Sequence, residues 1–575
     1  MLDVEEGGTP LHTIDMEETN YQPLGPPLHG PALEHDAADD SMHTADTSPP
    51  IPTTADPSLE QDMDEQEVLI FTDVFEPHPL FMTNANPGIL MPDNHNCLDF
   101  LRLWQWHKRH HNLKDIRGMP RNEDSIAAVT KPRVKYDDLM GDECDLQGIN
   151  WRHLGVTRSW GRKCRARTFR NYTNKAGSDT WHSSLPDRLL ARNENYFRYR
   201  SMDLRPDVRL LHFQLRNIMG CPSRNAVYYP SLHDTVTALN PTNGLTRTAM
   251  RFKSREDAAV STLAAEEGIL ITGGFYGTYQ YRHLEAEDES SCYDGRLTDH
   301  ISGITNHVQV NSSRSSSVPL ATFASNDCGF RIVDLSRNEL TVNRRYQFAV
   351  NCTALSPDKR LRVMVGDEQA IFIAEAETGE IVQRLEGHRD FGFACDWAPD
   401  GWTVATGNQD KSIRIWDARK WKNSNGESIS TAVMRCEMAG VRSLRFSPLG
   451  SGKRLLLAAE EADIINIVDA QTFNSKQTVD IFGELAGVSF TSAGQEIVAL
   501  SSDPVRGGVL CLERCDHGVE DTFDFSPNQH PQEWWHTPGY DWLPTPQQVV
   551  NHPDTQVTLN QKKRMQAVMS EDWLI

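Results

Sequence analysis

Four side chains in the second half of the sequence have the types and the spacing to act as one group. They are His388, Thr406, Asp410 and Trp416. An imidazole and a carboxylate could serve in acid–base catalysis. Together with a hydroxyl and an indole N–H, the same groups could instead form a buried hydrogen-bond network that stiffens a sheet. Short strand-like runs separate these residues. The pattern therefore favours the structural role, and we expect no catalytic residue here.

The segment that must position these side chains runs from Gly387 to Asp417 and contains three strand-like runs. Residues 391–397 end in a turn at 398–401, and residues 403–406 form the second run. In the third run, 412–416, isoleucines alternate with polar residues. A segment that opens with Gly-His and closes with Trp-Asp is a WD repeat, which forms one four-stranded blade of a β-propeller.

Weaker copies of this unit flank it along the chain. Ser356-Pro357-Asp358 matches Ala398-Pro399-Asp400 forty-two residues later, and Ser447-Pro448 recurs forty-nine residues after that. About seven units of roughly 40–45 residues fit between positions 205 and 525. The fold we predict is all-β, a WD40 β-propeller of about seven blades, with six or eight also compatible. A closed ring needs an early strand to complete its last blade, and residues 196–202 are the candidate.

The negative charge of the chain is concentrated at its N-terminus. The formal net charge is −23, no Lys or Arg precedes Arg102, and residues 1–100 contain 21 Asp and Glu. Residues 1–66 are poor in aromatics and are predicted to be a disordered acidic head. Residues 67–100 mix apolar residues with prolines and are predicted to be an extended docking segment. A basic pre-propeller extension at 101–204 and a C-terminal tail at 526–575 complete the domain plan.

Residues 151–170 carry seven Lys and Arg and no acidic residue, with aromatic residues between them. Such a segment could contact a polyanion such as nucleic acid or chromatin. The candidate contacts are Arg158, Arg162, Lys163, Arg165, Arg167 and Arg170. Residues 101–575 are nearly neutral overall, which favours a basic arm that lies on the propeller rim or pairs with the acidic head. If the head covers this arm at low salt, deleting residues 1–66 should expose it.

A second candidate contact lies at the end of the clearest repeat. Trp416-Asp417-Ala418-Arg419 resembles the box by which some WD-repeat proteins dock on the adaptor of a cullin-RING ubiquitin ligase. In that interpretation Asp417 and Arg419 lie at the contact, and the protein is a substrate receptor. Ordinary WD repeats also end in this way, so the motif leaves both interpretations open.

Several classes of protein are disfavoured by the motifs that the sequence lacks. It contains no phosphate-binding Gly-rich loop, no Gly-x-Ser-x-Gly motif and no His-Glu-x-x-His motif. Among the eleven Cys, Cys511 and Cys515 are the nearest pair, and no second pair has the spacing of zinc ligands. The sequence contains no run of about 18 apolar residues, the length needed to span a membrane. We therefore expect a non-enzymatic scaffold, without cofactor or metal, that holds protein or peptide partners on its propeller face. We expect it in the cytoplasm, the nucleus or both.

The pre-propeller region resembles that of a known family. The segment YDDLMGDECDLQGINWRHLGVTRSWGRKCRARTFRNYTN is similar to a signature of a little-characterised WD-repeat family of fungi and plants. The matching residues are Asp145, Gln147-Gly148-Ile149, Trp151, Thr157-Arg158, Arg165, Arg167 and Asn171-Tyr172. The resemblance covers roughly residues 70–520, and few blades here keep the Trp-Asp ending. It implies a propeller with an N-terminal extension and no known catalytic residue.

Overall fold

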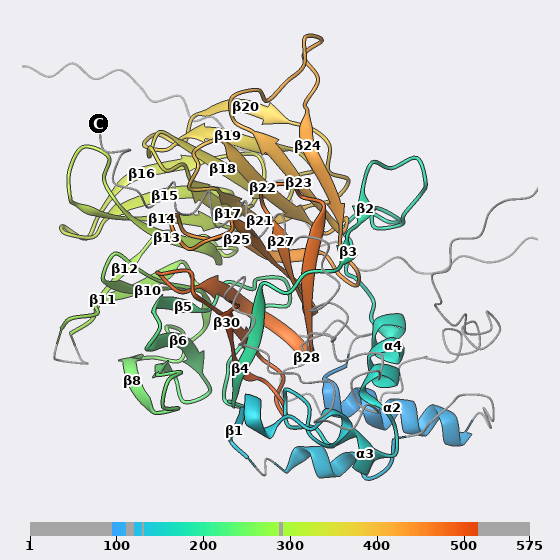
Figure 1. Ribbon diagram of the computed structural model, residues 1–575. Helices are drawn as coiled ribbons and strands as arrows, with labels where there is room; N and C mark the ends of the chain where they lie inside the picture. The colour runs from blue at the N-terminus through green and yellow to red at the C-terminus, as the bar shows by residue number, and fades with distance from the viewer. Residues whose placement is uncertain (1–94, 111–119, 129–130, 287–290, 516–575) are drawn as a thin grey trace, which may run out of the picture. The chain divides into compact units, whose positions relative to one another are not determined.

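A computed structural model of the chain describes residues 95–110, 120–128, 131–286 and 291–515. Antiparallel four-stranded sheets follow one another along these residues and surround a common centre (Figure 1). Five of the six sheets are one blade each and the sixth comprises two, so the described residues form seven blades. Blades 6 and 7 belong to one continuous sheet, because strand β28 (Ser475–Phe490) leaves blade 6 and becomes the inner strand of blade 7. The predicted all-β propeller is confirmed.

Blades 1 to 4 each contain four consecutive strands, which follow one another in chain order from the centre outward. Blade 1 contains β5 (Gly220–Ser223), β6 (Ala226–Ser231), β7 (Thr235–Leu239) and β8 (Thr246–Arg251). Blade 2 contains β9 (Val260–Glu266), β10 (Ile269–Gly274), β11 (Thr278–His283) and β12 (Tyr293–Arg296). Blade 3 contains β13 (Thr305–Ser312), β14 (Pro319–Ser325), β15 (Gly329–Asp334) and β16 (Glu339–Arg345). Blade 4 contains β17 (Val350–Leu355), β18 (Leu361–Gly366), β19 (Ile371–Glu375) and β20 (Ile381–Leu385).

Blades 5 to 7 also recruit strands from the segment that precedes the propeller. Blade 5 contains β21 (Gly392–Trp397), β22 (Thr403–Asn408), β23 (Ser412–Asp417) and β24 (Ser430–Arg435), with β2 (Arg188–Leu189) parallel to β24. Blade 6 contains β25 (Val441–Phe446), β26 (Leu455–Glu460), β27 (Ala462–Asp469) and the first part of β28, with β3 (Ala191–Arg192) beside it. Blade 7 contains the rest of β28, β29 (Glu496–Ser501), β30 (Gly508–Arg514), β4 (Phe197–Leu204) and β1 (Arg133–Lys135).

The ring is closed by β4, which pairs antiparallel with β30 along its whole length. This is the strand that the sequence indicated at residues 196–202. Its residues alternate between the blade core and the outer surface, and Tyr199 donates its hydroxyl to the carbonyl oxygens of Val134 and Leu146, both at 2.9 Å. β4, which precedes blade 1 in the chain, is therefore held in the last blade by main-chain hydrogen bonds to β30.

Local sequence explains where the strands of blade 5 begin and end. Lys411 adopts a left-handed conformation with φ 60°, and the Ser412 N–H donates to Asp410 Oδ1 at 3.0 Å, so the turn between β22 and β23 is tight. Along β23, Ile413 and Ile415 are buried while Arg414 between them is only half-buried. This is the alternation expected of a strand with one face in the core.

Before the propeller, the chain forms an extension that groups at one side of the blades in Figure 1. Its elements are α2 (Cys97–His110), η2 (Glu123–Ala127), η3 (Tyr136–Asp138), η4 (Gly141–Glu143), α3 (Trp151–Leu154) and α4 (Arg158–Thr168). Most of the predicted docking segment 67–100 lies outside the described residues, as do the acidic head 1–66 and the tail 526–575. Cys97 to Phe100 begin a helix, which corrects the predicted extended conformation at that end.

Candidate interaction surfaces

In blade 5 the structure brings together the four side chains that the sequence singled out. Thr406 Oγ1 accepts from Trp416 Nε1 at 2.9 Å and lies 2.9 Å from His388 Nε2. The other ring nitrogen of His388 lies 3.3 Å from Asp410 Oδ2. Ser412, which sequence reasoning did not include, donates its hydroxyl to Asp410 Oδ1 at 2.7 Å. The network joins the connection between β20 and β21 to β22 and β23.

The protonation of this network follows from its geometry and burial. Burial lowers the pKa of His388, although the charge of Asp410 opposes this shift. Burial alone would raise the pKa of Asp410, but His388 and hydrogen bonds from the Arg389 N–H and the Ser412 hydroxyl lower it to about 2. A neutral His388 accepts from Thr406 and donates to Asp410. Every polar group then has a partner and none faces solvent, an arrangement suited to a structural role.

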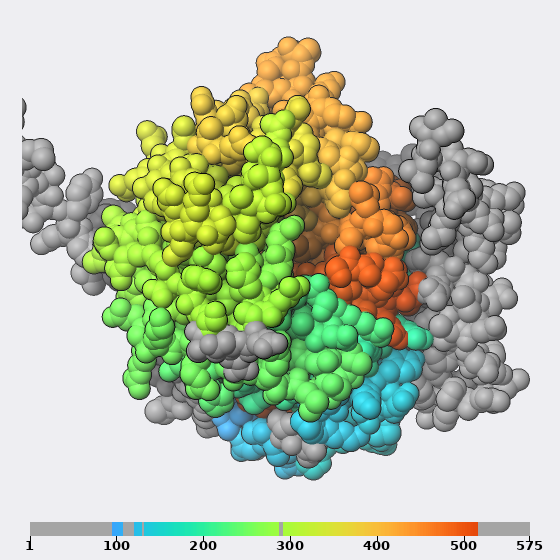
Figure 2. Space-filling model, turned by 90° about the vertical axis from the view of Figure 1, so that its left-hand side faces the viewer, coloured from blue at the N-terminus to red at the C-terminus, as the bar shows by residue number. Residues whose placement is uncertain are grey.

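The propeller has an upper face, which we define as the connections between successive blades and the turns between the second and third strands of each blade. The extension lies on this face over blades 5 to 7. The Cys97 N–H donates to Asp503 Oδ2 at 2.9 Å, and Gln147 Nε2 donates to the carbonyl oxygen of Phe482 at 2.8 Å. Further along, Asn171 Nδ2 donates to the carbonyl oxygen of Gln409 at 2.9 Å. Figure 2 shows the extension, blue to cyan, away from yellow blade 4.

Three of the six arginines and lysines predicted to contact a polyanion are buried between helix α4 of this extension and the blades. Arg158 Nη2 lies 2.6 Å from Asp480 Oδ1, and Arg162 Nη1 and Arg165 Nε lie 2.8 and 3.1 Å from Asp463 Oδ2. The blade carboxylates thus neutralise them, and the prediction of a polyanion contact is corrected for these three residues.

The rest of the predicted basic patch remains accessible. Lys163 and Arg170 are exposed and Arg167 is half-buried. A surface of three cations is much weaker as a polyanion site than the six that the sequence suggested. The basic arm on the propeller, which we considered as the alternative, fits this arrangement.

A buried carboxylate that sequence reasoning did not select organises the centre of the extension. Asp145 accepts from the main-chain N–H groups of Gln147 and Ile149 at 2.9 and 2.8 Å, and from Trp151 Nε1 at 2.7 Å. It also lies 3.3 Å from Arg158 Nε. Trp151 packs on Phe482 with ring centroids 4.9 Å apart. The only signal in the sequence was that Asp145, Gln147 and Trp151 belong to the matching family signature.

The upper face of blades 1 to 3 presents apolar side chains to solvent. Leu232, in the turn between β6 and β7, is 52% exposed, and Tyr276, between β10 and β11, is also 52% exposed. Ile301, in the connection from β12 to β13, is 97% exposed. Exposed apolar side chains on one face are typical of protein-binding surfaces.

The central channel is narrow and polar. A cavity of about 150 Å³ is lined by inner-strand residues from all seven blades. Burial raises the pKa of Asp396 in this channel to about 6, although Arg445 opposes the shift. Since each water occupies about 30 Å³, a cavity of this size has room for a few waters but not for a peptide. Partners must therefore bind to the outer surfaces.

The predicted adaptor contact lies on the surface of blade 5. The Arg419 side chain is 65% exposed and its Nη2 lies 2.7 Å from Asp417 Oδ2. Its guanidinium also lies 4.9 Å from the ring centroid of Trp402. Trp416 is buried in the blade network, so Asp417 and Arg419 are the part of the box that a partner could reach.

Among the described residues, no group of three or more His, Cys, Asp or Glu could hold a metal ion. No helix in the same part of the chain is long and apolar enough to cross a membrane.

Comparison with known proteins agrees with the fold. The family model "WD domain, G-beta repeat" matches residues 379–417, which include the network of blade 5. With the seven blades, this match supports assignment of the chain to the WD-repeat β-propeller proteins. Proteins of this class bind protein partners and are generally non-enzymatic scaffolds.

The curated relatives are distant. The chain is 23% identical to the transcriptional corepressor LEUNIG_HOMOLOG of Arabidopsis thaliana over 32% of this chain and 28% of that protein. It is 31% identical to WD repeat-containing protein 1 of Rattus norvegicus over 21% of this chain and 20% of that one. It is 32% identical to a serine-threonine kinase receptor-associated protein of Dictyostelium discoideum over 12% of this chain and 24% of the relative. The chain thus spans about a quarter of the length of these relatives.

Proposed function

We propose that the protein is a non-enzymatic scaffold that binds a partner protein on the upper face of blades 1 to 3. The observation that carries this proposal is the contrast between the two parts of that face. Over blades 5 to 7 the extension occupies the loops with buried ion pairs. Over blades 1 to 3 Leu232, Tyr276 and Ile301 remain exposed. Burying large apolar side chains is the main favourable term in association, so these residues are suited to a protein contact.

The test is affinity purification of the full chain with partner identification. The double variant Tyr276→Ala/Ile301→Ser should lose the partners that the wild-type chain retains, with an unchanged melting temperature, because both side chains are exposed. Leu449→Ser is the matched control, since Leu449 is 70% exposed in a turn on the opposite face. Partners retained equally by all three proteins would refute the proposed surface. A reproducible catalytic turnover, lost on changing a pocket residue, would refute the non-enzymatic role.

A second candidate function is a substrate receptor of a cullin-RING ubiquitin ligase, favoured by the exposure of Arg419 beside Asp417. In this function Arg419 contacts the ligase adaptor. Arg419→Ala should abolish co-purification of the adaptor and leave the melting temperature unchanged, because an exposed ion pair contributes little to stability. Lys420→Ala, an exposed neighbour, is the control. If no adaptor co-purifies with the wild-type chain, this function is wrong.

We also propose that the chain is a member of the little-characterised WD-repeat family of fungi and plants that its extension resembles. The roles of Asp145, Gln147 and Trp151 support this proposal, since these signature residues fasten the extension to blade 7. We propose a location in the cytoplasm, the nucleus or both, which imaging of a tagged full chain would test.

A further inference from the structure

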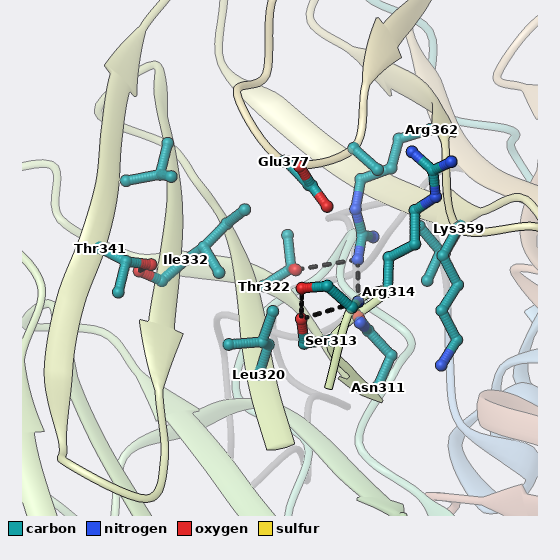
Figure 3. A pocket seen from close by; sticks show the side chains of 14 residues that line it. Asn311, Ser313, Arg314, Leu320, Thr322, Ile332, Thr341, Lys359, Arg362 and Glu377 are labelled. Carbon is teal, nitrogen blue, oxygen red and sulfur yellow. Dashed lines mark hydrogen bonds between the residues drawn. The ribbon is translucent and has the colours of Figure 1, made fainter. Parts of the chain in front are cut away.

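A pocket of about 280 Å³ opens between blades 3 and 4, on the face opposite the upper face (Figure 3). Its walls come from the ends of β13 and β17, the first residues of β14 and β18, and the turn after β19. Apolar side chains of Leu320, Ile332, Val342 and Leu355 line part of it. None of these residues takes part in the surface proposed above for partner proteins.

The charge of the pocket is strongly positive. Three cations line it, Arg314, Lys359 and Arg362, against a single carboxylate, Glu377. Arg314 and Glu377 are exposed at the mouth, and Lys359 is half-buried with its Nζ 2.6 Å from Ser312 Oγ. The lining therefore has an excess of two positive charges.

Arg362 is the unusual member of this set, because it is buried without an ion pair among the described residues. It is 1% exposed, and its guanidinium forms no ion pair with any carboxylate in the described part of the chain. It donates instead to neutral oxygens: Nη2 to Asn311 Oδ1 and Thr322 Oγ1, both at 2.9 Å, and Nη1 to Gln309 Oε1 at 2.7 Å.

The Nε–H of Arg362 has no acceptor among the described residues. Burial lowers the pKa of Arg362 to about 10, which reflects the cost of a desolvated cation. A cation that is buried and unpaired is normally costly to the fold. The cost is offset if an anion occupies the pocket.

We propose that this pocket binds a phosphate monoester. A monoester carries about −1.5 to −2 charges at neutral pH, which matches the excess of two positive charges, whereas a carboxylate carries one. Its oxygens would accept from Lys359, from Arg314 and from the Nε–H of Arg362, the one donor of that guanidinium without an acceptor among the described residues, and the carbon chain of the ester would lie on Leu320 and Leu355. The pocket has room for one such group rather than for a drug-sized ligand. The source can be a phosphorylated side chain or a small phosphorylated metabolite.

Isothermal titration calorimetry on the full chain tests this proposal with four probes. They are inorganic phosphate, O-phosphoserine, a short peptide containing phosphoserine, and glutamate. O-phosphoserine should bind, and glutamate should bind at least about tenfold more weakly because it lacks one charge and several acceptors. Tighter binding of the phosphopeptide than of O-phosphoserine identifies a protein source, and the reverse order identifies a metabolite. Equal affinity for glutamate and O-phosphoserine would overturn the specificity for phosphate.

Variants locate the binding in this pocket. Lys359→Gln and Arg314→Gln keep the fold because neither side chain is buried, and each should weaken O-phosphoserine about tenfold, the effect of one lost charged hydrogen bond. Arg362→Gln should abolish binding, with circular dichroism to verify folding. Arg360→Gln is the matched control, because Arg360 lies in the same turn but does not line the pocket. No binding by the wild-type chain, or equal binding by the Lys359 and Arg360 variants, would overturn the proposal.

Discussion

Arg162 in helix α4 and Asp463 in blade 6 form a buried ion pair with 2.8 Å between Nη1 and Oδ2, although 301 residues separate them in the sequence. Asp463 also accepts from Arg165 Nε at 3.1 Å and from the Gly483 N–H at 2.8 Å. Burial opposes the charge of Arg162, but Asp480 and Asp463 together raise its pKa. One blade carboxylate thus fixes both the extension and the connection between blades 6 and 7.

Replacing this carboxylate should weaken the attachment of the extension. Asp463→Asn leaves two buried arginines short of a counter-charge, which typically costs about 3–5 kcal/mol. We expect a clear fall in the urea midpoint and earlier proteolysis within residues 95–200. Glu143→Gln, which removes an exposed partner of Arg152, is the control and should leave both unchanged. If Asp463→Asn behaves like the control, the ion pairs do not hold the extension in place.

The blade 5 network predicts a loss of stability in mild acid. Burial holds the pKa of His388 below its value in the unfolded chain, so the unfolded state binds a proton first as the pH falls. Stability should therefore decrease as the pH falls below about 6.5, the unfolded pKa of histidine. Asp410, with a pKa of about 2, stays ionised throughout this range.

The measurement compares melting temperatures at pH 7.5 and 5.5 in the wild-type chain and in His388→Asn. The variant should be less stable at pH 7.5, because it loses hydrogen bonds, but it should lose less on acidification. An equal loss in both proteins would show that His388 does not contribute to the pH dependence.

At the pairing of β30 with β4, which closes the ring, we expect one position at which even one added methyl group is not tolerated. Gly508 begins β30 with φ 141°, and a Cβ there would lie 2.0 Å from the carbonyl oxygen of Asp203 in β4. Gly508→Ala should cost about 4 kcal/mol or prevent folding. Gly401→Ala is the control: its φ is 88° but a Cβ there meets nothing within 4 Å. This control should cost about 1–2 kcal/mol from backbone strain. Similar melting temperatures for the two variants would argue against closure by β4.

The repeats could be predicted because turn residues within a repeat mark where its strands end. Asp410 and Lys411 mark the turn of blade 5, and the Ser356 and Ser447 copies set the spacing of its neighbours. The position of the closing strand followed from the need of a ring for one more strand. The turns depend on neighbouring residues, and the closing strand depends on the ring topology. Both can therefore be inferred from the sequence.

The arrangement of the extension could not be predicted, because it depends on pairs far apart in the chain. The sequence offered a polyanion contact or a basic arm on the propeller rim for the bases of α4, but it did not indicate their partners. Arg158 is neutralised by Asp480 and Arg162 by Asp463, which lie 322 and 301 residues away. The pocket of Arg362 was missed for the same reason. Its acceptors Asn311 and Thr322 belong to the neighbouring blade, and a single arginine in a strand carries no signal of its own.

The burial of these arginines changes the expected effect of the acidic head. Of the six predicted contacts, Lys163, Arg167 and Arg170 are the ones that are not buried, so deleting residues 1–66 should raise binding to an anionic polymer only slightly at low salt. Binding should be the same in both proteins at physiological salt, where the Debye length is roughly 8 Å. Fluorescence anisotropy with a labelled anionic polymer across a salt series provides the comparison. A large gain at low salt would instead support masking of the arm by the head.

The contrast between a covered and an open part of the upper face is tested most directly by hydroxyl-radical footprinting of the full chain. Leu232, Tyr276 and Ile301 should be modified rapidly, at rates near that of exposed Leu449. Trp151 of the extension and Phe482 of β28, which pack on each other, should be protected. Rapid modification of Trp151 and Phe482, or protection of Tyr276 and Ile301 in the absence of any partner, would contradict the account.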